Sequence, residues 1–132
     1  AALDWLMTMS LEKMYERFPN LRIASVENGS TFLPDHFRKL PQQKNKLMGW
    51  FKEDPLEQFK EHVWINPFWE DDPSEVADYM GSDRVIFGSD WPHIEGMPTP
   101  LDYVDELNTF NEHDRKLILL DNVLELNKPR PA

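Results

Sequence analysis

The segment RVIFGSDWPH, residues 84–93, places an acid and a histidine directly after an apolar run. The letters VIF are typical of a buried strand, and Pro92 ends regular pairing just beyond it. Asp90 therefore lies at the carboxyl end of the predicted strand, with His93 three residues further on. In parallel α/β folds, ligands bind and chemistry occurs at this end of the strands. The segment predicts an active-site rim around Asp90, unless Asp90 only caps the turn before the proline.

Two further predicted strands also end in side chains that could contact a ligand. The segment LRIASVE ends at Glu27, and HVWINPF carries Asn66 and Phe68 near its end. Glu27 could serve as an acid, a base or a hydrogen-bond acceptor, or it could pair structurally with an arginine or a backbone amide. Asn66 and Phe68 are candidates to line the rim, with Trp91 covering it. Aromatic side chains at such positions also commonly belong to the core.

Helical patterns alternate with these strands. Ser10 is a predicted N-cap for the helix SLEKMYERF, whereas Asp54, Asp72 and Asn111 are predicted to start later helices. A short helix is predicted for FLPDHFRKL, and the stretch 41–54 is predicted to be a surface loop. One further predicted helix opens near Thr99 and has an apolar face formed by Leu101, Val104, Leu107 and Phe110.

Such alternation predicts an α/β fold with right-handed crossovers and a parallel sheet. Parallel sheets are buried on both faces, and sheets average about five or six strands. Three strands with this many helices therefore fit the end of a larger fold.

Two histidines in predicted helices, His36 and His113, are expected to be solvated, and His62, at the opposite end of its strand, is expected to be structural.

Composition restricts the partners. Acidic residues outnumber basic ones 24 to 14 among 132 residues, giving a formal charge of −10, so we expect neither nucleic acid nor a membrane surface as partner. The absence of cysteine excludes thiolate metal sites and cysteine nucleophiles. No apolar run approaches the roughly 18 residues of a membrane-spanning helix, and no secretory signal is recognisable, so we expect a cytoplasmic protein.

The segments LRIASVENGSTFLPDHFRKL, PLEQFKEHVWINPF, RVIFGSDWPHIEG and LLDNVLELN together resemble the amidohydrolase-related superfamily. The most similar branch includes aminocarboxymuconate-semialdehyde decarboxylase and related carboxy-lyases. This resemblance implies a TIM (β/α)8 barrel, of which residues 1–132 would form the C-terminal part, about the last three βα units, and an incomplete domain. A whole barrel needs about 250 residues. The family's His-x-His pair on the first strand and its histidine on the fifth lie outside this segment.

The resemblance also implies a function. Full-length members carry a divalent metal, here expected to be zinc, and catalyse hydrolysis or non-oxidative decarboxylation of a small carboxylated or cyclic substrate. Asp90 would be the eighth-strand metal ligand and a proton carrier, and His93 would contact the substrate or the surroundings of the metal. Glu27 stands where other branches place a histidine, which is a departure from the family pattern. Asn66, Phe68 and Trp91 would bind substrate.

One alternative belongs to another class of protein. The chain could be a self-contained, non-enzymatic α/β binding or interaction module in which Glu27 and Asp90 merely end capped turns. Three parallel strands leave open sheet edges, which favour pairing with a second copy. We therefore expect a homo-oligomer, and we expect the 132-residue chain alone to be inactive.

Overall fold

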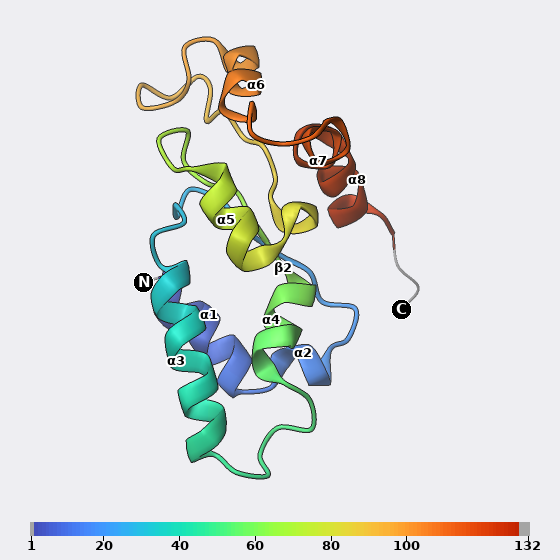
Figure 1. The fold of residues 1–132 in the computed structure, drawn as a ribbon. Coiled ribbons are helices and arrows are strands. Elements are labelled where there is room, and N and C mark those ends of the chain that lie inside the picture. The colour runs from blue at the N-terminus through green and yellow to red at the C-terminus, as the bar shows by residue number, and fades with distance from the viewer. Residues whose placement is uncertain (1, 130–132) are drawn as a thin grey trace.

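The computed structural model describes residues 2–129 and has a small parallel sheet covered by helices (Figure 1). Strand β1 (Ile23–Ser25) pairs with β2 (Val63–Ile65) in parallel, with Ile23 opposite Val63. The third predicted strand is reduced to a single parallel bridge between Val85 and Ile65. It is short because, among the described residues, no strand pairs with its other edge. The fold is thus mixed α/β, as expected, with a sheet smaller than expected.

Helices precede, separate and follow these strands along the chain. No helix within residues 2–129 is long and apolar enough to cross a membrane. In Figure 1, α1 to α4 gather around the lower part of the molecule, and α6 lies at its upper end. The helical elements are α1 (Ala2–Leu11), α2 (Met14–Arg17), α3 (Leu33–Lys46), α4 (Pro55–His62), α5 (Pro73–Met80), η1 (Ser82–Arg84), η2 (Pro100–Asp102), α6 (Tyr103–Glu106), α7 (Glu112–Lys116), the π-helical turn η3 (Leu117–Asp121) and α8 (Asn122–Asn127).

Three predicted helix starts are confirmed by their capping bonds. The Asp54 carboxylate accepts a hydrogen bond from Leu56 N at 2.9 Å, and Asp72 caps α5 in the same way through Ser74 N. Both caps precede a proline at the first helical position, where its missing N–H costs nothing. The side chain of Asn111 accepts from Asp114 N at 2.9 Å and starts α7.

Other local predictions differ from the structure. Ser10 lies inside α1 rather than at a helix start, and its hydroxyl donates to Leu6 O at 3.1 Å. Helix α3 continues through Pro41 to Lys46, so most of the first half of the predicted loop 41–54 is helical. The helix predicted to open near Thr99 is present but ends before Phe110, since η2 and α6 together span residues 100–106. Its start is the short turn η2, and Leu101 is 81% exposed.

His36 is buried rather than solvated. It lies on the inner face of α3 with no exposed surface, and its ring centroid is 4.2 Å from that of Phe59 on α4. Neither ring nitrogen has a hydrogen-bond partner among the described residues. Burial lowers the pKa of His36 to about 4, against the opposing effect of the adjacent Asp35 carboxylate. The prediction for His113 is confirmed, since it is exposed on α7.

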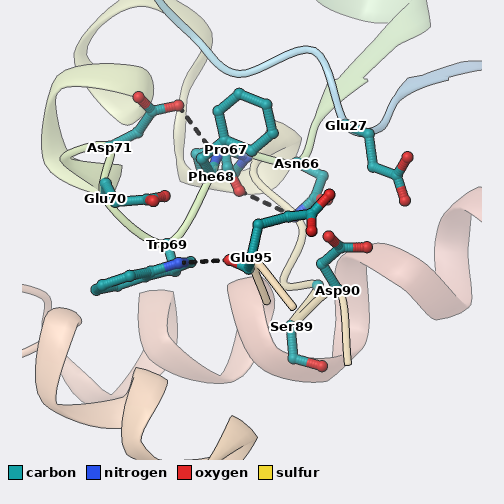
Figure 2. A pocket seen from close by; sticks show the side chains of 11 residues that line it. Glu27, Asn66, Pro67, Phe68, Trp69, Glu70, Asp71, Ser89, Asp90 and Glu95 are labelled. Atoms are coloured by element: carbon teal, nitrogen blue, oxygen red, sulfur yellow. Dashed lines mark hydrogen bonds between the residues drawn. The ribbon is translucent and has the colours of Figure 1, made fainter. Parts of the chain in front are cut away.

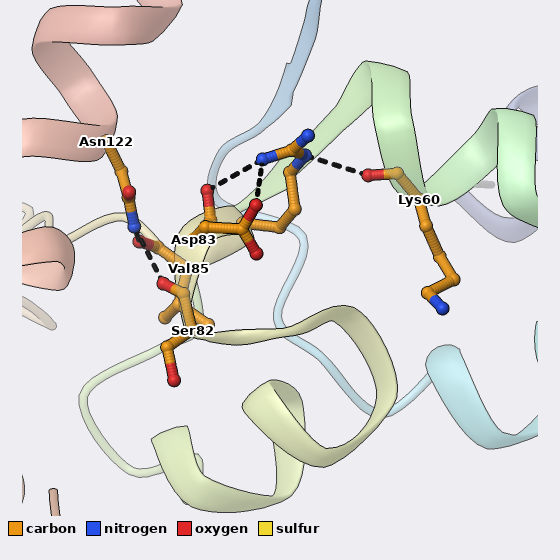
Figure 3. Close-up of polar contacts among 6 residues, drawn as sticks. Lys60, Ser82, Asp83, Val85 and Asn122 are labelled. Atoms are coloured by element: carbon orange, nitrogen blue, oxygen red, sulfur yellow. Dashed lines mark hydrogen bonds and ion pairs between the residues drawn. The ribbon is translucent and has the colours of Figure 1, made fainter. Parts of the chain in front are cut away.

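The C-terminal helices hold the segment that leads to Asp90. Asn122, buried at the start of α8, donates hydrogen bonds from Nδ2 to Ser82 O and to Val85 O, both at 2.7 Å (Figure 3). Two residues further on, Phe87 N donates to Ile118 O at 3.1 Å. These bonds satisfy backbone groups that a neighbouring strand would otherwise pair.

Candidate functional site

An acid–histidine cluster forms where two strand ends meet. Glu27 follows β1, while Asp90 and His93 follow the bridge at Val85. Each of the three offers one ligating atom, and these atoms all lie within 4.8 Å of one another. The carboxylate of Asp90 lies 3.1 Å from His93 Nδ1. The structure thus brings together the three residues predicted to be catalytic.

A closed loop sets the spacing between Asp90 and His93. His93 N donates to Asp90 O at 2.9 Å, and Met97 N donates to Ser89 O at 2.8 Å, closing the loop at its base. Gly96 fits against this base so tightly that a Cβ there would lie 2.6 Å from Asp90 O. Real Cβ atoms essentially never approach so closely, so any larger residue at position 96 must displace the backbone that carries the acid.

The backbone at both acids is unusual. Glu27 has a φ of 57° and Asp90 a φ of 54°, which is the left-handed region that glycine prefers. Such conformations cost a non-glycine residue about 1–2 kcal/mol and concentrate at functional sites. A turn alone would be better served by glycine. The conformation places the two carboxylates close together, although it also occurs at Lys13, outside the cluster.

Asp90 does not cap its own turn among the described residues. The hydroxyl of Ser89 accepts the hydrogen bond from Trp91 N at 3.2 Å, which is the capping interaction of this turn. The partner of the Asp90 carboxylate is the imidazole of His93. The turn-capping alternative for Asp90 is therefore not supported by the geometry.

Beside the cluster lies a pocket of about 450 Å³. Four of the predicted site residues line it, whereas His93 and Trp91 do not, and Trp91 is 65% exposed. The pocket is lined by Glu27, Asn66, Pro67, Phe68, Trp69, Glu70, Asp71, Gly88, Ser89, Asp90 and Glu95 (Figure 2). Sequence analysis did not identify Trp69, Glu70, Asp71 or Glu95 as lining residues. Residues 69–71 follow β2 directly, and this position at a strand end could have identified them as pocket residues.

Asn66 is fixed in one orientation. It is 9% exposed, and its Nδ2 donates to Pro67 O and to Ile86 O, both at 3.2 Å. Its amide also lies against Gly88, where a Cβ would come within 2.9 Å of both Nδ2 and Oδ1. Rotating the amide by half a turn would bring Oδ1 against two carbonyl oxygens. Asn66 therefore keeps Oδ1 as an oriented acceptor in the pocket wall.

Two loops that line the pocket are held by their own contacts. The Asp71 carboxylate accepts hydrogen bonds from Ser30 N at 2.9 Å and from Phe68 N at 3.0 Å. Gly29, with a φ of 63°, lets the Phe68 ring approach, because a Cβ there would lie 2.8 Å from a ring carbon. Across the pocket, Trp69 Nε1 donates to Glu95 O at 3.0 Å. Asp71 is thus part of the support rather than a free carboxylate.

A family model for amidohydrolases matches residues 1–126 of the chain. The chain belongs to the amidohydrolase family. Among solved structures, an amidohydrolase from Mycobacterium avium subsp. paratuberculosis is 40% identical to it with a TM-score of 0.91. That alignment covers 94% of this chain but 32% of the neighbour, so the chain spans about a third of that protein's length. The search of curated proteins gave no match.

The cluster of this amidohydrolase chain fits a divalent cation. Two carboxylate oxygens and one imidazole nitrogen are ligand types that such cations accept. Two negative charges no more than 4.8 Å apart repel each other by about 1 kcal/mol even in bulk water and by more beside a protein wall. Within residues 2–129, no lysine or arginine lines the adjoining pocket to offset this repulsion. A cation between the carboxylates would relieve it.

Proposed function

We propose that this chain is the C-terminal part, about the last three βα units, of a metal-dependent TIM-barrel amidohydrolase. The full-length enzyme would hydrolyse or non-oxidatively decarboxylate a small carboxylated or cyclic substrate. The observation that carries the proposal is the meeting of Glu27, Asp90 and His93 within 4.8 Å, at strand ends of a family whose members use divalent metals. The remaining ligands would lie on strands outside these residues, since the chain spans 32% of its solved relative.

In this proposal Asp90 and Glu27 hold the metal, which we propose to be zinc, with His93 beside them. A bound divalent cation supplies Lewis acidity and lowers the pKa of a coordinated water. The rigid loop keeps the Asp90 carboxylate in place, and its 3.1 Å contact with His93 Nδ1 gives a route for a proton between the two side chains. Asn66 and Phe68 bind the substrate, while Trp91, on the exposed side of the loop, covers it.

Glu27 is the residue that sets this chain apart from the branches that carry a histidine at the corresponding strand end. A carboxylate at this place adds a negative charge beside Asp90, whereas a histidine would add a neutral or positive ring. We propose that Glu27 acts as a ligand or a base in this enzyme. Its left-handed backbone supports a role beyond surface solvation.

Zinc titration of the 132-residue chain tests the metal centre. Asp90→Asn and Glu27→Gln should each weaken zinc binding at least about tenfold, because each removes one of the two carboxylates that hold the metal. Asp78→Asn, a change of the same kind at an exposed acid on α5, should leave the affinity unchanged. Equal affinity in all variants would refute the centre. In the full-length enzyme, Asp90→Asn should abolish turnover without unfolding the protein.

The non-enzymatic interaction module is the less favoured function. Family membership supports an enzymatic parent, and the turn-capping role that the module assigns to Asp90 is filled by Ser89 instead. The expected inactivity of the isolated 132 residues follows from the same proposal, because most metal ligands would be supplied from elsewhere in the barrel.

A further inference from the structure

We propose that the pocket beside the acid–histidine cluster binds the positively charged end of the substrate, an ammonium or guanidinium group on an apolar stem. This inference rests on the proposed function, because it assigns the non-reacting end of the same substrate. With a volume of about 450 Å³, the pocket has room for a small organic group next to Glu27 and Asp90.

The first support is Asn66, the most deeply buried polar side chain of the pocket wall. Its side-chain hydrogen bonds to described residues are both donated by Nδ2, to Pro67 O and to Ile86 O, and its Oδ1 accepts none from them. As an amide oxygen in the pocket lining, Oδ1 can accept an N–H from a ligand but has nothing to donate to a ligand oxygen. The fixed orientation of Asn66 therefore selects a ligand that donates.

The second support is the pair of aromatic side chains on the loop after β2. Phe68 is packed over Gly29, and Trp69 is anchored through Nε1 to Glu95 O on the opposite loop. Both rings are held in place and remain about half exposed, with 46% of Phe68 and 41% of Trp69 accessible. Aromatic rings bury an apolar stem and attract a cation placed over them.

The third support is the distribution of charge around the pocket (Figure 2). Of the carboxylates in its lining, Glu27 and Asp90 belong to the cluster, and Asp71 is bound by two backbone amides. Glu70 and Glu95 remain, and neither forms an ion pair with a described residue. Among the described residues, the lining contains no lysine, arginine or histidine, so a carboxylate group placed beside Glu70 and Glu95 would meet like charge.

These three features favour one ligand chemistry. The oriented acceptor takes an N–H donor, the rings cover the stem, and Glu70 and Glu95 balance the charge. The substrate would then present its reacting atoms to Glu27, Asp90 and His93 while its cationic end occupies the pocket. A substrate with a second carboxylate at that end would be rejected.

Three probes of similar shape test the inference on the 132-residue chain: benzylammonium, benzyl alcohol and benzoate. Binding is followed by NMR at the Trp69 indole N–H and the Asn66 side-chain amide, in the presence of a chelator so that no metal contributes. Benzylammonium should bind about tenfold more tightly than benzyl alcohol, and benzoate more weakly than both. Equal affinity for the three probes, or a preference for benzoate, would overturn the inference.

Single substitutions assign the preference to the pocket. Glu70→Gln and Glu95→Gln should each weaken benzylammonium binding about threefold and leave benzyl alcohol unchanged. Glu106→Gln, the same change at an exposed acid on α6, should have no effect. A preference that survives both pocket variants would reflect the net charge of the chain and would overturn the inference.

The two proposals fail separately. If zinc binds at Asp90 but the three probes bind equally, the metal centre stands and the cationic pocket is refuted. If benzylammonium is preferred but zinc affinity is the same in the Asp90→Asn variant, the pocket stands as a cation site and the metal centre is refuted.

Discussion

Replacing His36 by leucine should make the protein more resistant to acid. His36 has a pKa of about 4 in the folded protein and about 6.5 when unfolded, so the unfolded chain binds the proton first as the pH falls. The contribution of neutral His36 to the free energy of unfolding is therefore fully present above the unfolded pKa, and it is lost as the pH falls toward the folded pKa. Each pH unit between the two pKa values changes the free energy of unfolding by about 1.36 kcal/mol, so the loss of stability by pH 4.5 is about 2.5 kcal/mol. Leucine has a similar volume, carries no proton and leaves no buried N–H unpaired.

Urea unfolding of both proteins at several pH values, followed by tryptophan fluorescence, measures this difference. The free energy of unfolding of His36→Leu minus that of the wild type should grow by about 2.5 kcal/mol between pH 8 and pH 4.5. Titrating carboxylates affect both proteins alike and cancel. His113→Gln, a change at an exposed ring on α7, should give a curve parallel to the wild type. If the His36→Leu difference is the same at every pH, the ring is not buried in its neutral form, and the reasoning is refuted.

Three further predictions follow from single contacts. Gly96→Ala should weaken zinc binding about tenfold, because its Cβ would lie 2.6 Å from Asp90 O. Gly49→Ala, whose Cβ would have nothing within 4 Å, should leave zinc binding unchanged. Equal zinc affinity in the two variants would refute the steric argument. Asn122→Leu should lower the free energy of unfolding by about 2–3 kcal/mol, since Val85 O and Ser82 O each lose the hydrogen bond from Nδ2. Urea denaturation measures this change, and an unchanged free energy would contradict the prediction. Val26→Lys, at the exposed edge beyond β1, should reduce the self-association that we expect for the chain, and light scattering that stays unchanged would contradict this.

Structural features that depend on neighbouring residues alone could be predicted from the sequence. A cap such as Asp72 needs only the residues that follow it, so the start of α5 could be predicted from the sequence. The burial of His36 could not, because it depends on Phe59, which lies on another helix. The strand before Asp90 came out shorter than predicted for a related reason. Its length depends on a partner on each edge, and among the described residues only one edge has a strand partner.

The candidate site shows the same division. Asp90 and Glu27 could be found because acids at the ends of parallel strands share one edge of the sheet. Glu95 could not, since its place in the pocket depends on the bond from Trp69 Nε1 and on the close approach of Gly96 to Asp90 O, contacts that no spacing rule contains. The fixed acceptor on Asn66 likewise depends on Ile86 O, twenty residues further along the chain.

The π-helical turn η3 has an evolutionary consequence. Through the bond from Phe87 N to Ile118 O, this turn holds the edge of the segment leading to Asp90 that is not paired with β2. A π turn holds one residue more than an α turn, so deleting that residue would shift the accepting carbonyl along the helix. Relatives with a regular helix at 117–121 should therefore also differ in the GSDWPH loop. The two segments, about thirty positions apart in sequence, are expected to change together in descent, and an alignment of full-length relatives would reveal them as a covarying pair.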